Sequence, residues 1–373
     1  LLSPDAFRSA LNYMSPEPYD VVDRTHLRTT QGVTQALNNR LSQRRLGVPT
    51  TTAQSSGAST MFASRDTNPN LVLLALDPEE RDEMAQASRL PGTKISLWAQ
   101  GFYLYSSQND ASDRTGYNAN TGGGMIGADV NVTDNLLAGL MFAYTYTHAG
   151  YDGLGGDADI NSYRVGPYLS WEPLERLAID FSVSYAFSQV DASRNVIVGS
   201  TASTADANYN AHDLSVYLGA EYDVIPDRQW YVAPLVGFNY VWFHQDAFAE
   251  SGAGGANLNV NAQDTNSLDL RAGGRFAWYG KISDDFAIIP EAVVAYRREL
   301  LADQNAGIGA SFINAGGPGF TVSRGPVDEN GIEVGAGVTL LINRNFSLYA
   351  NYSGTFYSSS VNHMATAGLR FDF

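Results

Sequence analysis

The sequence contains no cysteine, and this absence removes several kinds of function at once. A chain without thiols can form no disulfide framework, no thiolate zinc site and no cysteine nucleophile. The absence also suits a protein that has to cross an oxidising periplasm.

Long apolar runs are missing as well. The longest run, Leu71 to Leu76, is far shorter than the roughly 20 residues that a transmembrane helix needs. We therefore expect no membrane-spanning helix. A membrane-spanning β-barrel stays possible, because each of its strands needs only about 10 residues of alternating polarity.

Basic residues are scarce. The 23 Lys and Arg residues face 39 Asp and Glu residues, which gives a formal net charge of −16. Phosphate binding needs a basic surface, so this balance argues against nucleic acid as a partner. Aromatic residues make up 12% of the chain and apolar residues 44%, which is too much for a disordered protein.

The first part of the chain has a helical pattern. Ser3-Pro4 forms an N-cap signal for a short helix that ends near Tyr13, and a longer helix is predicted from Tyr19 to Leu46, stopped by Gly47-Val48-Pro49. We assign residues 1–46 to these linker helices. Residues 47–92 are predicted to be a flexible linker with one short helix near 78–89.

The longer predicted helix is polar on nearly every side. Its apolar stripe is thin, and after Asp23 it carries only basic charges, at Arg24, Arg28, Arg40, Arg44 and Arg45. A helix of this kind either bridges through solvent or lies in a polar enclosure. At 1.5 Å per residue it would be about 42 Å long, enough to cross a bilayer.

From residue 93 onward, apolar and polar residues alternate with a period of two. The alternation predicts twelve long strands over about 93–105, 120–132, 136–148, 159–171, 177–190, 208–224, 229–245, 265–280, 286–300, 329–342, 346–357 and 361–373. One alternating strand also fits a soluble antiparallel sheet, but soluble strands are usually about 5–6 residues long.

The predicted connections differ in length at the two ends of the strands. Long loops are expected around 106–119, 191–207, 246–264 and 301–328, whereas most connections at the other end are short turns. This asymmetry is typical of outer-membrane barrels, with the short turns in the periplasm. We predict an all-β fold, a twelve-stranded antiparallel transmembrane β-barrel over residues 93–373, in preference to a soluble all-β fold.

The last residues form a candidate assembly signal. Thr366, Gly368, Phe371 and Phe373 follow the pattern polar, glycine, aromatic, aromatic, which resembles the terminal signal that the barrel-assembly machinery binds. An alternating strand can add to an open sheet edge through main-chain hydrogen bonds. The alternative is an ordinary amphipathic last strand.

Short motifs along the chain resemble those of the translocator unit of type V (classical) autotransporters. Ala10-Leu11-Asn12-Tyr13-Met14-Ser15-Pro16-Glu17 is similar to the family's linker motif, although Pro replaces Gly and two other positions differ. Further similarities lie at 97–101, 122–129, 248–254 and 348–352, and their order and spacing carry the resemblance. Nothing in the family pattern accounts for the roughly 45 residues between the basic helix and the first strand.

The resemblance implies a barrel in the outer membrane of a Gram-negative bacterium, with one helix threading the lumen toward an exported passenger. The implied partners are the barrel-assembly machinery, outer-membrane lipid and lipopolysaccharide, and the chain's own passenger domain. No Met and no signal peptide stand at the start, so we expect the C-terminal part of a longer protein.

The charges suggest how the helix lies in the pore. Asp180, Glu221, Glu291 and Glu333 fall at inward-facing strand positions, and we hypothesise that Arg24, Arg28, Arg40 and Arg44 face these carboxylates. The alternative is a solvated basic helix in the periplasm.

Asn38-Asn39 lies in the middle of the predicted helix. Some autotransporters release their passenger by asparagine cyclisation at such a pair, but here Arg40 follows instead of an apolar residue. Two ordinary amides on the helix surface are the preferred interpretation.

We expect no enzyme activity, no cofactor and no metal. The five histidines, His26, His148, His212, His244 and His363, show no metal-ligand spacing, and the acidic loop 152–157 fits a solvated loop better than a weak calcium site. Three alternatives remain open: a small-solute porin, an adhesive barrel that uses loops 191–207 and 301–328, and a barrel with a hydrolase site at its rim.

Overall fold

A computed structural model describes residues 3–47 and 95–373, apart from the stretches 112–113, 226–228, 284–285, 302–306 and 314–317 and positions 326 and 344. The flexible linker predicted at 47–92, with its short helix, lies almost entirely outside these residues. Within the described part of the chain, no helix is both long enough and apolar enough to cross a membrane.

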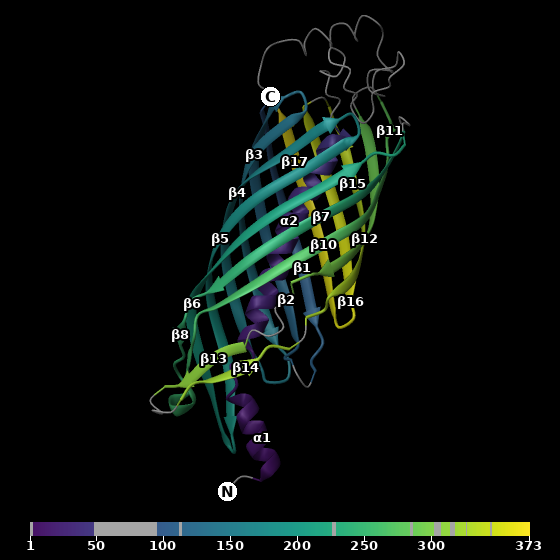
Figure 1. Cartoon of the computed structure of the whole chain (residues 1–373). Helices are drawn as coiled ribbons and strands as arrows, with labels where there is room; N and C mark the ends of the chain where they lie inside the picture. The colour runs from purple at the N-terminus through teal and green to yellow at the C-terminus, as the bar shows by residue number, and fades with distance from the viewer. Residues whose placement is uncertain are drawn as a thin grey trace, which may run out of the picture.

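Twelve antiparallel strands form a closed barrel (Figure 1). Each strand pairs with its neighbour in chain order, and β1 pairs with β17 from Ser96–Asp372 to Gln108–Ser360 to close the circle. The strands of the barrel are β1 (Ile95–Gln108), β2 (Tyr117–Thr133), β3 (Leu136–Tyr151), β4 (Gly156–Leu174), β5 (Leu177–Val198), β6 (Thr201–Tyr222), β7 (Trp230–Gln245), β10 (Gln263–Trp278), β12 (Ala287–Glu299), β15 (Asn330–Leu341), β16 (Phe346–Tyr357) and β17 (Ser360–Asp372). All twelve predicted strands are present, so the predicted fold class is confirmed.

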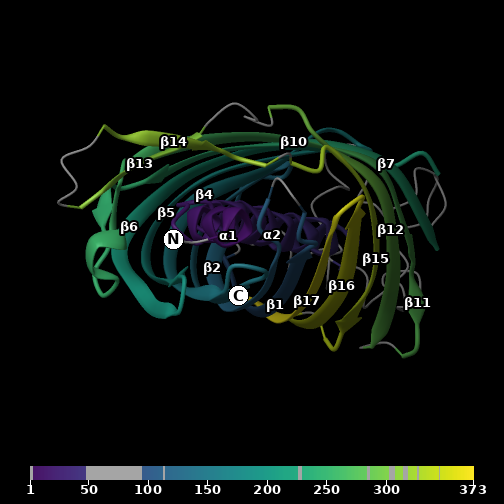
Figure 2. The same cartoon turned by 90° about the horizontal axis from the view of Figure 1, so that it is seen from below.

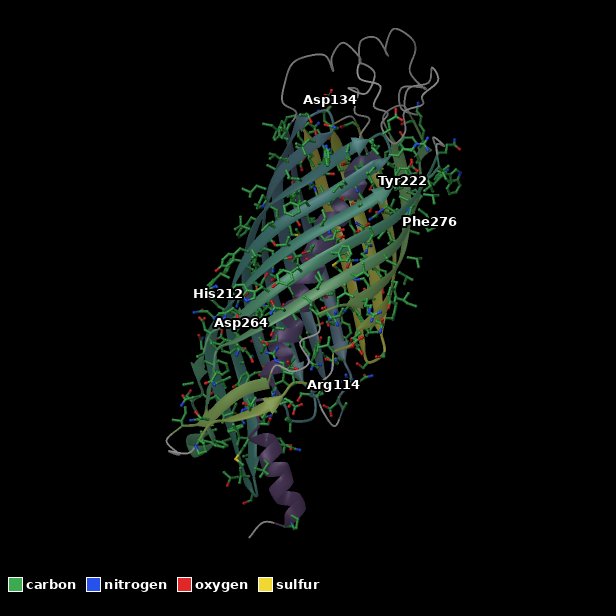
Figure 3. All side chains as sticks on the ribbon, in the orientation of Figure 1. Arg114, Asp134, His212, Tyr222, Asp264 and Phe276 are labelled. Atoms are coloured by element: carbon green, nitrogen blue, oxygen red, sulfur yellow. The ribbon has the colours of Figure 1, made fainter. Side chains whose placement is uncertain are left out.

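The two faces of the wall differ as the sequence pattern predicts. Along β1, buried and exposed residues alternate, and the same alternation holds in most of the other long strands. Outward residues are mostly apolar, as with Leu140, Leu218 and Phe276, whereas many inward residues are polar or charged (Figure 3). Because a lipid-facing surface must be apolar and a filled lumen can be polar, this pattern is that of a membrane barrel.

Helix α2 (Tyr19–Gly47) runs through the lumen, and the view along the barrel shows the strands surrounding it (Figure 2). Helix α1 (Pro4–Tyr13) lies beyond the end of the barrel that carries the long loops and packs against β5. Both helices match their predicted bounds to within one residue. The chain turns between them at Ser15, whose hydroxyl accepts a hydrogen bond from the Glu17 amide, and at Pro16 and Pro18.

The barrel has two distinct ends. Asp134, in the tight turn after β2, marks the short-turn end, and Arg114, between β1 and β2, marks the long-loop end (Figure 3). Helix α2 begins near the long-loop end and finishes at the short-turn end.

The prediction of a long loop at 191–207 was wrong. Strands β5 and β6 continue through it and pair in register up to Val198–Thr201, where Gly199 has a positive φ of 63° in the tight turn. The sequence hid this extension because small and polar residues replace apolar ones once a hairpin leaves the membrane.

Two other long loops contain short strands. β8 (Phe248–Ala249) and β9 (Leu258–Val260) come from the connection before β10, and β13 (Gly307–Phe312) and β14 (Phe320–Ser323) come from the connection before β15. They form one four-stranded sheet in the order β14-β13-β9-β8. Its apolar residues Phe248, Leu258 and Ile308 join Tyr19 and Val22 in a buried cluster, so the sheet packs on the start of α2.

Candidate functional site

The candidate site is the contact between α2 and the inner wall, and one of its buried charged groups is Arg40. The Arg40 guanidinium forms an ion pair with Asp129 of β2 and lies 4.4 Å from the centre of the Trp98 ring. The Tyr168 hydroxyl donates to Asp129 at 2.8 Å and accepts a bond of the same length from Trp98 Nε1. We call Arg40, Asp129, Tyr168 and Trp98 the Arg40 cluster. Arg40 and Asp129 are each only 2% exposed.

Two glycines make room for the rings of the Arg40 cluster. A Cβ atom at Gly139 would lie 2.2 Å from the Tyr168 ring, and one at Gly127 would lie 2.4 Å from the Trp98 ring. Side chains at these positions would therefore displace the rings that hold Arg40 and Asp129.

The end of α2 nearest the short turns is held by two more arginines. Arg45 donates to both carboxylate oxygens of Asp180, at 2.7 and 2.9 Å, and forms a 3.2 Å ion pair with Glu221. Arg44 lies 3.6 Å from Asp129 and donates to Asn131 at 2.8 Å. Basic side chains also interact favourably with the negative end of the helix dipole.

Glutamines carry the contacts along the middle of α2. Gln35 Nε2 donates to Glu333 at 2.9 Å, and Gln43 Nε2 donates to Glu291 at 2.6 Å. Both carboxylates already have arginine partners on the wall: Arg271 and Arg297 bind Glu333, and Arg275 binds Glu291 at 2.5 Å. The wall therefore neutralises these charges itself, and the helix completes the hydrogen bonds.

A buried histidine fixes the next part of the helix toward the long loops. His26 Nε2 lies 2.7 Å from Asp213 Oδ2, and Arg164 also binds Asp213 at 2.8 Å. Thr30, one turn further along α2, accepts a 2.7 Å hydrogen bond from Arg164. Asp213 is fully buried, so these partners supply the compensation that a buried charge requires.

The start of α2 contacts the four-stranded sheet of β8, β9, β13 and β14, which we call the long-loop sheet. Arg194 of β5 forms a 2.6 Å ion pair with Glu250, which also accepts a 2.6 Å bond from the Tyr19 hydroxyl. A second bond runs from Arg194 to the backbone oxygen of Tyr13, at the end of α1. Nearby, Asp23 forms an ion pair with Arg324. The segment that leads from α1 into α2 is thus held by contacts of Arg194 and Glu250 and by the Asp23–Arg324 ion pair.

The pairing we hypothesised between the arginines and carboxylates differs from the observed one. Arg24 binds Asp20 of its own helix, Arg28 stacks on Tyr357, and Arg40 and Arg44 share Asp129. Of the four predicted inner carboxylates, Asp180 and Glu221 contact α2 through Arg45 and, for Glu221, Ser42, whereas Glu291 and Glu333 contact its glutamines. Sequence reasoning did not select Asp129 and Asp213 as inner carboxylates, although their place in the alternation marks them as inward.

The Asn pair lies in intact helix inside the barrel. Asn39 accepts a 3.3 Å hydrogen bond from Arg275, and the side-chain oxygen of the buried Asn38 has no hydrogen-bond partner.

The residues of the candidate assembly signal line two faces of β17. Phe371 and Phe373 are exposed on the outer surface and pack edge to face, with ring centres 4.7 Å apart. Thr366 is buried on the inner side, and Gly368 lies against the Tyr349 ring.

Four of the five histidines lie in strands on the outer surface. His148 and His244 each lie 2.9 Å from a carboxylate oxygen, of Asp159 and Asp264. His212, which is labelled in Figure 3, and His363 each form a hydrogen bond with a tyrosine hydroxyl. In the part of the chain that the structure describes, no three His, Asp or Glu side chains gather closely enough to hold a metal ion.

The surroundings of Asp328, which lies outside the strands of the barrel, predict that the stability of the protein depends on pH. Its carboxylate accepts hydrogen bonds from the hydroxyls of Ser358, Ser359 and Ser360, at 2.6 to 2.7 Å, in the β16–β17 turn. Burial acts to raise the pKa of Asp328, but these hydrogen bonds outweigh it and the pKa lies below its ordinary value. The stabilisation is therefore complete at neutral pH and is lost as the pH falls through this lowered pKa.

We expect Asp328→Asn to lower the temperature of barrel unfolding by roughly 2–4 °C at pH 7 and to change it little at a pH below the lowered pKa of Asp328, where the carboxyl group is protonated. Heat-modifiable gel migration of the detergent-solubilised protein at several pH values measures this. An equal loss at both pH values would contradict the role of the ionised carboxylate.

Comparison with known proteins identifies the family. The model of the family described as "Autotransporter beta-domain" matches residues 97–353. Outer membrane protein B of Rickettsia japonica is 27% identical over 207 residues, 52% of this chain and 12% of that protein. An extracellular serine protease of Serratia marcescens is 26% identical over 283 residues, 74% of this chain and 26% of that protein. The chain thus spans about an eighth and a quarter of the length of these two relatives.

Solved structures show the same fold. The translocator domain of the autotransporter NalP from Neisseria meningitidis superimposes with a TM-score of 0.59 at 16% identity, covering 79% of this chain and 94% of NalP. The β domain of the Bordetella autotransporter BrkA gives 0.55 at 17% identity, covering 75% and 99%. With a filled twelve-stranded barrel and a family match over most of its strands, this chain belongs to the autotransporter beta-domain family and lies in the outer membrane of a Gram-negative bacterium.

Proposed function

We propose that this chain exports a passenger attached to its N-terminus and then anchors that passenger at the cell surface through α2. The observation that carries the proposal is the set of contacts along the whole of α2, from the Tyr19–Glu250 bond to the Arg45–Asp180 pair. A helix bound at so many points is a suitable anchor. Its N-terminal end leads to α1, beyond the long-loop end, which is where a surface passenger would continue (Figure 1).

The same contacts support the proposal that the structure corresponds to the state reached after the passenger has been exported. In the part of the chain that the structure describes, α2 and its wall partners occupy the lumen, so a polypeptide crossing beside α2 would have to displace contacts such as those of Arg40 and Gln43 (Figure 2). We propose that α2 enters last, once the passenger has crossed, and that the ion pairs then hold it. Transport would draw on folding energy and would need neither nucleotide nor catalytic metal.

We propose that the barrel itself is not an enzyme. Polar groups inside the barrel pair between helix and wall, as in the Arg40 cluster, and His148, His212, His244 and His363 lie on the outer surface. Any enzymatic activity would then belong to the passenger.

The outer surface supports lipopolysaccharide as a partner. Toward the long-loop end, the outward apolar residues give way to a band of hydrogen-bonded polar and aromatic groups, including Tyr146 with Asp159 and Trp242 with Asp264. Amphipathic rings with polar neighbours suit the boundary between acyl chains and sugar headgroups. We further propose that the exposed Phe371 of β17 and Phe373, the residue after β17, are bound by the barrel-assembly machinery.

The absence of cysteine allows a clean test of orientation in whole cells. Leu11 on α1 is exposed beyond the long-loop end, and Asp134 lies at the short-turn end. In a Gram-negative host, Leu11→Cys should react with a membrane-impermeant maleimide, whereas Asp134→Cys should react only after the outer membrane is permeabilised. Labelling of Asp134→Cys and not of Leu11→Cys in intact cells would overturn the proposed anchoring.

A further inference from the structure

The long-loop sheet lies at the mouth of the barrel, beside the point where α2 enters the lumen (Figure 1). One face of the sheet is apolar and buried, and its Phe248, Leu258 and Ile308 belong to the same cluster as Tyr19 of α2. The rings of Tyr19 and Phe248 pack edge to face, with their centres 4.8 Å apart. The first turn of α2 therefore supplies part of the apolar core of this sheet.

Charged groups bind the β14 edge of the sheet to the helix. Arg324, which follows β14, forms ion pairs with Asp23 and, at 3.4 Å, with Asp20. In return, Arg24 of α2 donates at 2.9 Å to the backbone oxygen of the residue after Arg324. The barrel wall contributes a hydrogen bond from Arg324 to the uncharged hydroxyl of Thr265. Arg324 is 9% exposed, so its charge needs carboxylate partners, and both of these belong to α2.

The opposite edge of the sheet, at β8, is bound to the barrel wall. Ser251 exchanges two backbone hydrogen bonds with Asp206 of β6, at 2.8 and 2.9 Å. Both carboxylate oxygens of Glu250 accept hydrogen bonds from Arg194 of β5, at 2.8 and 2.6 Å. These contacts join the sheet to the wall directly, so they would remain if the helix were outside the lumen.

The two edges of the sheet therefore depend on α2 to different degrees. Without the helix, the β8 edge keeps its wall contacts, whereas the β14 edge loses the carboxylates that balance Arg324. The apolar face of the sheet would also lose the cover that Tyr19 provides. Because a buried charge without a partner and an uncovered apolar face are both unfavourable, the observed position of the sheet is stable when α2 is in place.

We propose that the long-loop sheet is a latch that closes on the first two turns of α2 once the helix has entered, and that its β14 edge stands away from the mouth until then. The closed latch opposes withdrawal of the helix, since α2 cannot leave without breaking the ion pairs of Arg324 and uncovering Phe248. Its role rests on the proposed function, in which α2 is the last segment to enter the lumen.

The reaction of single cysteines with a water-soluble maleimide, measured on the purified full chain, tests the latch. Ile308 is 1% exposed, so Ile308→Cys should react slowly, whereas Thr321→Cys, exposed on the neighbouring strand β14, should react fast. Adding Asp23→Ala should open the latch and raise the reaction rate of Ile308→Cys by at least about tenfold. The matched control is Gln43→Ala, which removes a contact near the other end of α2 and should leave that rate unchanged.

Removal of residues 1–46 gives a second measurement, on barrels checked by heat-modifiable migration. In the truncated protein, Ile308→Cys should react about as fast as Thr321→Cys, and Leu258→Cys in β9, which is also fully buried in the full chain, should repeat the result.

Equal protection of Ile308→Cys with and without residues 1–46 would overturn the proposal, because the wall alone would then hold the sheet. An unchanged rate with Asp23→Ala would overturn it as well. Labelling of Leu11→Cys in whole cells reports separately on the anchoring of a surface passenger, so a failure of the proposed function and a failure of the latch give different results.

Discussion

Replacing Arg40 by Ala should destabilise the folded protein by about 3–5 kcal/mol, because it leaves the Asp129 carboxylate buried without its main partner. Asp129 is 2% exposed, and its other basic neighbour, Arg44, is 3.6 Å away. The Tyr168 hydroxyl alone provides too little compensation for a charge in this position. The Trp98 ring would also lose the guanidinium that covers it.

The temperature at which the heat-modifiable form unfolds measures this loss. The double variant Arg40→Met, Asp129→Asn should recover much of the stability, since removing both charges removes the penalty of an unpaired one. Arg298→Ala, on the exposed outer face, should change the temperature little. If Arg40→Ala proved no less stable than Arg298→Ala, the Arg40 cluster would not hold the helix.

The barrel was predictable because its physical constraint repeats at every second residue. A wall with lipid on one side and polar contacts on the other forces the alternation in all twelve strands, so their number and approximate bounds follow from the sequence. The constraint ends where the hairpins leave the membrane. For this reason the part of the β5–β6 hairpin at the long-loop end and the four short strands β8, β9, β13 and β14 were not predicted.

The inner contacts were less predictable for a geometric reason. Strand parity shows that Asp180, Glu221, Glu291 and Glu333 face inward, but the partner of each also depends on the rotation and the depth of α2. Each residue along a helix turns the side chain by about 100°, so Arg44 and Arg45 reach different parts of the wall. Their actual partners, Asp129 on one side and Asp180 on the other, follow from this rotation.

Glu291 and Glu333 show a second reason why the partners of the inner carboxylates could not be predicted from the sequence. Their inward position suggested partners on the basic helix, yet arginines of the wall reach them first. Such pairs connect strands that are neighbours in the barrel, and an inward arginine one or two strands away is as near as any residue of the helix. The overall charge separation between helix and wall therefore predicted the location of α2 but not its individual bonds.

Removal of α2 should produce the largest change in the conductance of the barrel. The helix lies in the lumen, surrounded by the strands (Figure 2), and contacts the inner wall through groups such as Arg40 and Gln43. Without it, the inner ring of ion pairs on the wall, such as Arg275 with Glu291 and Arg271 with Glu333, would remain and line a wide aqueous pore. The wall pairs should also keep the barrel folded, since they do not depend on the helix.

The most direct test of the account compares single-channel conductance of the full chain and of a chain lacking residues 1–46, both checked for the heat-modifiable form. We expect a small conductance for the full chain and a uniform conductance many times larger for the truncated one. Equal conductance in the two proteins would show that α2 does not occupy the pore.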